Sequence, residues 1–171
     1  MSKEASSEKV FYTNAGERLT LRAAVEQVHD FIVSNPEREY EVIIGSDSNA
    51  SLSGSANFIS SIVVRRIGNG AIYFWTRHTE RFYNMRDRIQ KETMQSILLA
   101  QECKSLLKEI GGEDLFWDGR VTFQCIHLDV GEYGPTKDIL DSMTGLVRGY
   151  GFEPVIKPDS YGAFCVADRH T

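Results

Sequence analysis

The chain has 171 residues, of which 42% are hydrophobic and 25% charged, and its formal net charge is −5. These values fit one globular domain and argue against a protein that coats nucleic acid through bulk positive charge. No stretch approaches the roughly 18 apolar residues of a membrane span, and the polar start MSKEASSEKV lacks an apolar signal segment, so we expect a cytoplasmic protein.

The cysteines indicate neither a disulfide framework nor a zinc site. They are odd in number, widely spaced and form no C-x-x-C pair: Cys103, Cys125 and Cys165. Buried, reduced thiols are therefore expected.

Positive charge gathers in one part of the chain. Residues 65–91 hold seven Lys or Arg against two acids, a local charge of +5 that leaves −10 for the remainder. This split permits a phosphate-binding face on an acidic body, although a solvated hairpin face explains it equally well.

Residues 1–19 are predicted to form a flexible N-terminal arm, followed by a single domain over residues 20–171. Thr20 is a suitable N-cap for a helix whose apolar residues recur at helical spacing. They are Leu21, Val25, Val28 and Ile32. Asn35-Pro36 ends this helix.

Three antiparallel strands are predicted next. The first covers about 41–47 and is followed by the Ser/Asn/Gly loop SNASLSGSAN. The segment ISSIVVRRI forms the second strand, Gly68-Asn69-Gly70 is a hairpin signal, and AIYFWTR forms the third strand.

A long helix over about 85–110 follows and stops at Gly111-Gly112. A fourth strand is predicted over 121–130, then a helix that carries Ile139, Leu140, Met143 and Val147, and a short fifth strand EPVIK. Ser160 can cap a last short helix that runs to about Asp168. The predicted order is therefore helix, three antiparallel strands, helix, strand, helix, strand and helix.

Two aspartates end apolar runs. Asp47 closes the run in EVIIGSDSN, and Asp129 closes the run in VTFQCIHLDVG. A carboxylate at the end of a buried strand is costly unless a metal, a basic partner or backbone donors compensate it. Ordinary turn chemistry is the competing interpretation of Asp47.

Two further carboxylates complete a candidate site. Glu92 lies beside the apolar stripe of the long helix, and Asp168 lies on the last helix. Oxygen ligands of this kind favour Mg²⁺ or Mn²⁺, and two such ions support phosphodiester cleavage. A solvent-facing Glu on a helix surface is nevertheless the commoner case for Glu92.

Two neighbouring residues could support these carboxylates. His127 is two residues before Asp129 and could orient a ligand or relay a proton, although a hydrogen-bonded core histidine is the commoner case. Ser48 could support Asp47 or contact a phosphate, and turn chemistry explains it as well. His170 receives no role.

The order of elements resembles the ribonuclease H fold, which implies an α/β fold with a central mixed five-stranded sheet flanked by helices. The segments IIGSDSN, HLDVGEYGPT and KPDSYGAFCVADRHT resemble the YkuK-type family of ribonuclease H-like bacterial proteins, over roughly residues 10–171. The resemblance implies that Asp47, Glu92, Asp129 and Asp168 bind two divalent metal ions. Glu102 and Asp87, on the same helix, compete with Glu92 for its position.

Three functions follow from these patterns. The first is a metal-dependent nuclease in which Arg86, Arg88 and Lys91 hold backbone phosphates of a nucleic acid. The second is a catalytically silent binding or scaffold module with the same fold. The third, an ATP-binding phosphotransfer protein, rests on an Asp-x-Gly turn at Asp129, but GEYGPTK lacks the spacing of a P-loop.

Overall fold

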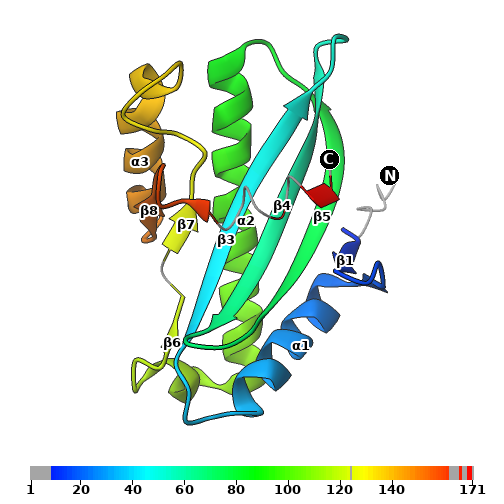
Figure 1. The fold of residues 1–171 in the computed structure, drawn as a ribbon, viewed down its shortest axis with the longest axis vertical. Helices are drawn as coiled ribbons and strands as arrows, with labels where there is room; N and C mark the ends of the chain where they lie inside the picture. The colour runs from blue at the N-terminus through cyan, green and yellow to red at the C-terminus, as the bar shows by residue number, and fades with distance from the viewer. Residues whose placement is uncertain (1–8, 124, 162–165, 167–168, 171) are drawn as a thin grey trace, which may run out of the picture.

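The computed structural model describes residues 9–123, 125–161, 166 and 169–170. Within them, a mixed sheet has the strand order β2-β1-β5-β4-β3-β7-β8, and β6 also pairs with β3 (Figure 1). The strands are β1 (Phe11–Thr13), β2 (Arg18–Leu19), β3 (Tyr40–Ala50), β4 (Ser55–Arg66), β5 (Ala71–Arg81), β6 (Val121–Thr122), β7 (Cys125–His127) and β8 (Glu153–Val155).

The three long central strands form an antiparallel meander, whereas β6, β7 and β8 add in parallel. The helices are α1 (Leu21–Val33), α2 (Met85–Gly111) and α3 (Leu140–Gly149), with short 3₁₀ turns η1 (Glu113–Phe116) and η2 (Lys137–Ile139). The predicted α/β fold with a mixed sheet is confirmed, but the described sheet has eight strands rather than the predicted five.

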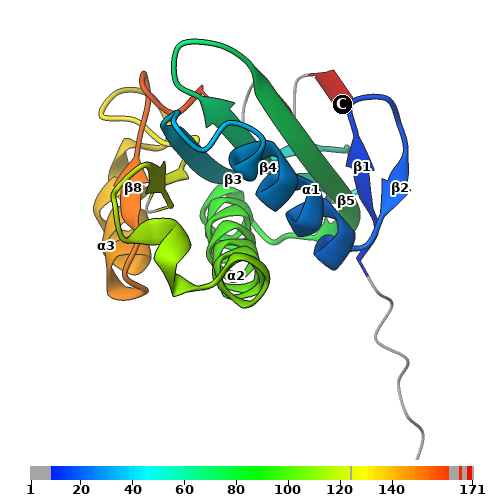
Figure 2. The same ribbon diagram turned by 90° about the horizontal axis from the view of Figure 1, so that it is seen from below.

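Helices α1 and α2 lie on the same face of the sheet (Figure 2). The predicted N-cap of α1 is present, since the Thr20 hydroxyl accepts a hydrogen bond from the Ala23 amide at 3.1 Å. The main core lies between these helices and the sheet, and it includes Val28, Ile44 and Leu107, none of which is exposed.

The opposite face of the sheet carries part of the described C-terminal segment. The ring of His170 stacks on Trp75 of β5, and the ring of Tyr161 packs edge-on against His127 of β7. Figure 2 shows the C-terminus on the side of the sheet away from α2.

Three predicted boundaries change. Residues 11–13 and 18–19 form strands rather than a flexible arm, because they pair with each other and β1 also pairs with β5. The predicted strand 121–130 is two short strands, β6 and β7, and the predicted loop over 48–57 is shorter because β3 and β4 extend into it. The predicted end of the last helix, including Asp168, falls outside the described residues.

Two compositional expectations can be compared with the structure. Cys103 and Cys125 are free thiols, Cys103 lies in the core and Cys125 is half-buried. Burial raises the pKa of the Cys103 thiol to about 12. No helix among the described residues has the length and apolar character to cross a membrane.

Candidate metal and phosphodiester site

Side chains of β3 alternate between the two faces of the sheet at the end of the strand. Ser46 accepts a hydrogen bond from Ser96 of α2 at 3.0 Å, and Ser48 donates one to Glu92 of α2 at 2.5 Å. Asp47 lies between them and therefore projects from the opposite face.

Burial is the main reason why the pKa of Asp47 is raised. The negative charge of Asp129 raises it further. One compensation is local, because the Ser48 amide donates to Asp47 Oδ1 at 2.8 Å. Asp47 is therefore a half-buried carboxylate that carries an electrostatic penalty.

The register of β7 sets Asp129 level with Asp47. Ile44 pairs with Ile126, and Gly45 pairs with His127. Asp47 and Asp129 each come two residues after the second of these pairs. Among the described strands, β7 pairs with no residue of β3 beyond Gly45. On its β7 side, β3 is left unpaired by the described residues from Ser46 onward, so side chains from both faces can approach one another at this open edge.

Glu92 reaches this open edge from α2. Its side chain is 6% exposed, and burial raises its pKa to about 8. Asp47 and Asp129 also raise this pKa, while the Ser48 hydrogen bond and Arg88 lower it. The charges of Asp47 and Asp129 thus oppose the ionisation of Glu92, and the charge of Asp129 opposes that of Asp47.

The two competing acids on α2 lie elsewhere. Asp87 lies in the first turn of α2, where its carboxylate accepts a hydrogen bond from the Tyr83 amide at 2.9 Å. Glu102 is exposed to solvent. Glu92 is therefore the acid of α2 that the structure brings toward Asp47 and Asp129.

A buried cluster of serines fixes α2 against the sheet beside the carboxylates. The hydroxyls of Ser46 and Ser60 lie 2.7 Å apart, and Ser96 bridges Ser46 to the Glu92 carbonyl oxygen, 3.0 Å from each. Because these bonds join β3, β4 and α2 one helical turn from Glu92, they hold the Glu92 backbone against β3. Sequence analysis missed this cluster, because its three serines come from separate segments with no shared pattern.

Lys157 is the cation nearest to Asp129. Its Nζ lies 2.7 Å from Asp129 Oδ1, and the Lys157 side chain is 53% exposed. The contact is an ion pair rather than a directed hydrogen bond, since Oδ1 has no partner of suitable hydrogen-bond geometry among the described residues. Sequence analysis missed Lys157, and the pairing of β7 with β8 places it there: Val155 pairs with His127, two residues before Lys157 and Asp129 respectively.

The donor set suits a hard divalent ion in its chemistry. Carboxylate oxygens are the ligands that Mg²⁺ and Mn²⁺ prefer, and the mutual repulsion of three carboxylates is relieved by a cation. Their present arrangement is not a closed site: within the described ranges, no three His, Cys, Asp or Glu side chains are grouped to hold an ion. The Asp129 carboxylate forms an ion pair with Lys157, and the Glu92 carboxyl accepts a hydrogen bond from Ser48.

His127 lies on the same sheet face as Asp47. It is 3% exposed, and burial, together with the positive charge of Arg65, lowers its pKa to about 4. Its imidazole is therefore neutral near pH 7.

The three basic residues predicted to hold phosphates differ in position. Arg88 is nearest the site, with Nε 3.9 Å from Glu92 Oε1 and a side chain that is 26% exposed. Lys91 is engaged by Glu80, and the exposed Arg86 donates a hydrogen bond to the Asp138 carbonyl oxygen at 3.5 Å. Arg88 is therefore the cation of α2 best placed to meet a phosphate at the carboxylates.

Comparison with known proteins agrees with this architecture. The family profile described as "Ribonuclease H-like" matches residues 23–171. The chain belongs to the ribonuclease H-like family. It is also 32% identical to "Uncharacterized protein YkuK" of Bacillus subtilis (strain 168), over 95% of this chain and 96% of that protein. No solved structure matches the sequence significantly.

Membership of the ribonuclease H-like family points to a nucleic-acid-related nuclease or binding module. The family commonly uses divalent metal ions. Fold alone does not fix the reaction, so a finer assignment has to come from the side chains at the open edge of β3.

Proposed function

We propose that this protein is a divalent-metal-dependent nuclease that hydrolyses phosphodiester bonds of nucleic acid. The supporting observation is Glu92, a buried carboxyl whose pKa is raised to about 8 beside two aspartates. Acids with raised pKa values, here Glu92 and Asp47, are typical of functional sites.

Asp47, Glu92 and Asp129 would hold Mg²⁺ or Mn²⁺, and Asp168 is proposed as a fourth ligand. When bound there, two such ions would supply the activation of a water and the stabilisation of the leaving oxygen in phosphodiester hydrolysis. Around them, Ser48 orients Glu92 through its 2.5 Å hydrogen bond.

The neighbouring cations have separate tasks in this proposal. Arg88 lies where it can bind a backbone phosphate next to Glu92. Lys157 neutralises Asp129 in the absence of metal and competes with a metal ion for its Oδ1. His127 is buried and neutral, and it lies in β7 two residues before Asp129.

The test compares the cleavage of single strands, duplexes, RNA/DNA hybrids and branched DNA by wild type and Asp47→Asn, with Mg²⁺ or Mn²⁺. Asp30→Asn is the matched control, since it removes the same charge from a side chain that is 80% exposed on α1. We expect wild type and Asp30→Asn to cut at equal rates and Asp47→Asn to show only background. Equal cleavage by Asp47→Asn would rule out the carboxylate mechanism.

A second candidate is a ribonuclease H-like binding module that works without metal. The Lys157–Asp129 ion pair favours it, because this contact neutralises one carboxylate with a residue of the chain itself. Wild type that cuts no substrate and whose Tm does not change with Mn²⁺ would support this second function.

A further inference from the structure

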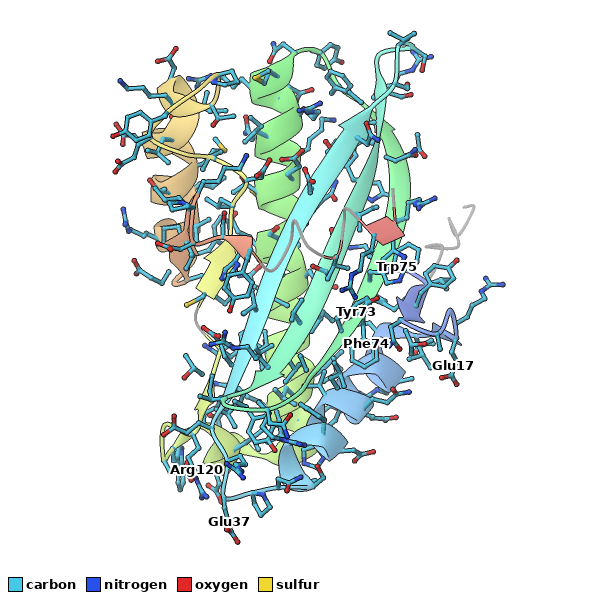
Figure 3. The ribbon with its side chains drawn as sticks, viewed as in Figure 1. Glu17, Glu37, Tyr73, Phe74, Trp75 and Arg120 are labelled. Atoms are coloured by element: carbon cyan, nitrogen blue, oxygen red, sulfur yellow. The ribbon has the colours of Figure 1, made fainter. Side chains whose placement is uncertain are left out.

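The face of the sheet opposite α1 and α2 carries aromatic rings followed by cations along β5. Alternate residues of β5 on this face are Tyr73, Trp75, Arg77, Thr79 and Arg81. Figure 3 shows Tyr73 and Trp75 beside the described C-terminal residues. Tyr12 of β1 extends the aromatic surface, because it pairs with Trp75 and its ring stacks on the indole at 4.8 Å.

His170 contacts this surface in three ways at once. Its ring lies nearly parallel to the Trp75 indole, at 4.1 Å and 14°. Its Nε2 is 3.3 Å from the Tyr73 hydroxyl, and the Arg77 guanidinium donates to its backbone carbonyl oxygen. The surface therefore holds a planar nitrogen heterocycle by stacking, a polar contact to a ring nitrogen, and a guanidinium on a neighbouring oxygen.

A nucleotide can make the same three contacts. Its base stacks on an indole, its ring nitrogens accept hydrogen bonds, and its phosphate oxygens bind guanidinium. His170 also leaves the platform incomplete, because the buried Trp75 Nε1 has no hydrogen-bond partner among the described residues. A nucleotide offers more acceptors than one imidazole and one carbonyl.

The charge around Trp75 and Arg77 suits a polyanion. From Tyr73 to Arg81 the outward positions of β5 include two arginines and no acid. The paired positions of β4, from Ser55 to Val63, are uncharged. This area is therefore positive on a chain whose net charge is −5.

The platform is close to the carboxylates. Asp47 pairs with Ile59 of β4, and Ile59 pairs with Arg77 of β5, so the three residues form one row across the same face. Two strand spacings separate the Asp47 and Arg77 backbones, roughly 10 Å. A strand whose base stacks on Trp75 can thus lead its backbone past Arg77 toward Asp47.

We propose that Tyr73, Trp75 and Arg77 form a base-stacking site for single-stranded nucleic acid, which the chain's own His170 occupies in this structure. Stacking selects unpaired bases, because the faces of paired bases are covered within a duplex. Strand binding at this site does not depend on whether the carboxylates cut the strand.

The test is fluorescence anisotropy of labelled single-stranded DNA and RNA oligonucleotides in EDTA, where metal-dependent cleavage is blocked. Trp75→Ala should weaken binding on the order of tenfold, and Trp75→Phe should recover most of the affinity. Trp117→Ala is the matched control, since Trp117 is 77% exposed on the loop after η1. Because Arg77 is exposed, Arg77→Ala tests the same site with little risk to folding.

His170→Ala distinguishes an occupant from a ligand-binding residue. Removal of the competing ring should tighten single-strand binding several-fold and leave duplex binding unchanged. Binding that is equal in wild type, Trp75→Ala and Arg77→Ala, or absent from all of them, overturns the proposal. Weaker binding by His170→Ala overturns the assignment of His170 as occupant.

Cleavage and binding can fail separately. Asp47→Asn should lose cleavage and keep single-strand affinity in EDTA, whereas Arg77→Ala should lose affinity at every metal concentration. A protein that binds strands through Trp75 but cuts none would contradict only the nuclease function.

Discussion

The ammonium of Lys157 lies 2.7 Å from Oδ1 of Asp129, so one carboxylate of the candidate site already has a cation beside it. The other two have weaker compensation: Asp47 accepts from the Ser48 amide, and Glu92 accepts from the Ser48 hydroxyl and has Arg88 Nε 3.9 Å away. A bound divalent ion would compete with the ammonium for Asp129. This competition makes Lys157 a sensitive probe of metal binding.

Lys157→Met should destabilise the metal-free protein modestly, by about 1 kcal/mol or less for a partly exposed pair. It should also increase the stabilisation that Mn²⁺ provides, because the ion no longer has to displace an ammonium. The measurement is Tm with EDTA and across a Mn²⁺ titration. Lys108→Met is the matched control, since Lys108 pairs with Glu113 at 3.2 Å far from the carboxylates. Equal Mn²⁺ responses in both variants would contradict the competition.

Glu92→Gln should remove a pH dependence of stability. Folded Glu92 keeps its proton up to a pH of about 8, whereas the unfolded carboxyl ionises near 4.5. Between these values the folded state binds more protons, so the free energy of unfolding of wild type falls as pH rises. The amide side chain of the variant cannot ionise. The free energy of unfolding of the variant should therefore rise relative to that of wild type as pH increases through this window, by on the order of a few kcal/mol.

Urea unfolding in EDTA at pH 5, 7 and 9 measures this gain. Glu102→Gln serves as the control, because Glu102 is exposed on the same helix and its substitution should leave the pH profile of wild type unchanged. Parallel profiles for wild type and Glu92→Gln would show that Glu92 ionises normally in the folded protein.

Sequence alone predicted the elements whose patterns are long and local. Helices α1 and α2 follow from apolar residues at helical spacing, and β4 and β5 follow from a strong turn at Gly68-Asn69-Gly70. The strands β1 and β2 were missed because three and two residues carry too little pattern, and their pairing partners decide their conformation. The split of the fourth strand into β6 and β7 was missed for the same reason.

The candidate site divides in the same way. Asp47 and Asp129 stand at the ends of apolar runs, a signal that one sequence displays, and Glu92 follows from its place beside the stripe of α2. Lys157 depends on the register between β7 and β8, and the stacking of His170 on Trp75 joins residues far apart in the chain. Such pairings are set by tertiary packing and leave no local trace.

Arg88→Ala should reduce cleavage mainly through a higher KM, because the guanidinium beside Glu92 is placed to bind substrate phosphate. Lys91→Ala should have a smaller effect, since the Lys91 ammonium is already engaged by Glu80. Steady-state kinetics at several salt concentrations separate the two, as a lost phosphate contact also lowers the salt dependence of binding. Equal losses in both variants would indicate a long-range effect of positive charge on α2.

Asp168→Asn tests the fourth carboxylate assigned by resemblance, which lies outside the described residues. If Asp168 binds metal, the variant should lose cleavage and bind Mn²⁺ more weakly, yet keep the single-strand affinity of wild type in EDTA. Deletion of residues 165–171 should also abolish cleavage, but it removes His170 and should therefore tighten strand binding, as His170→Ala does. Isothermal titration with Mn²⁺ and anisotropy with a labelled strand measure the two effects independently. Full cleavage by Asp168→Asn would leave Asp47, Glu92 and Asp129 as the entire carboxylate set.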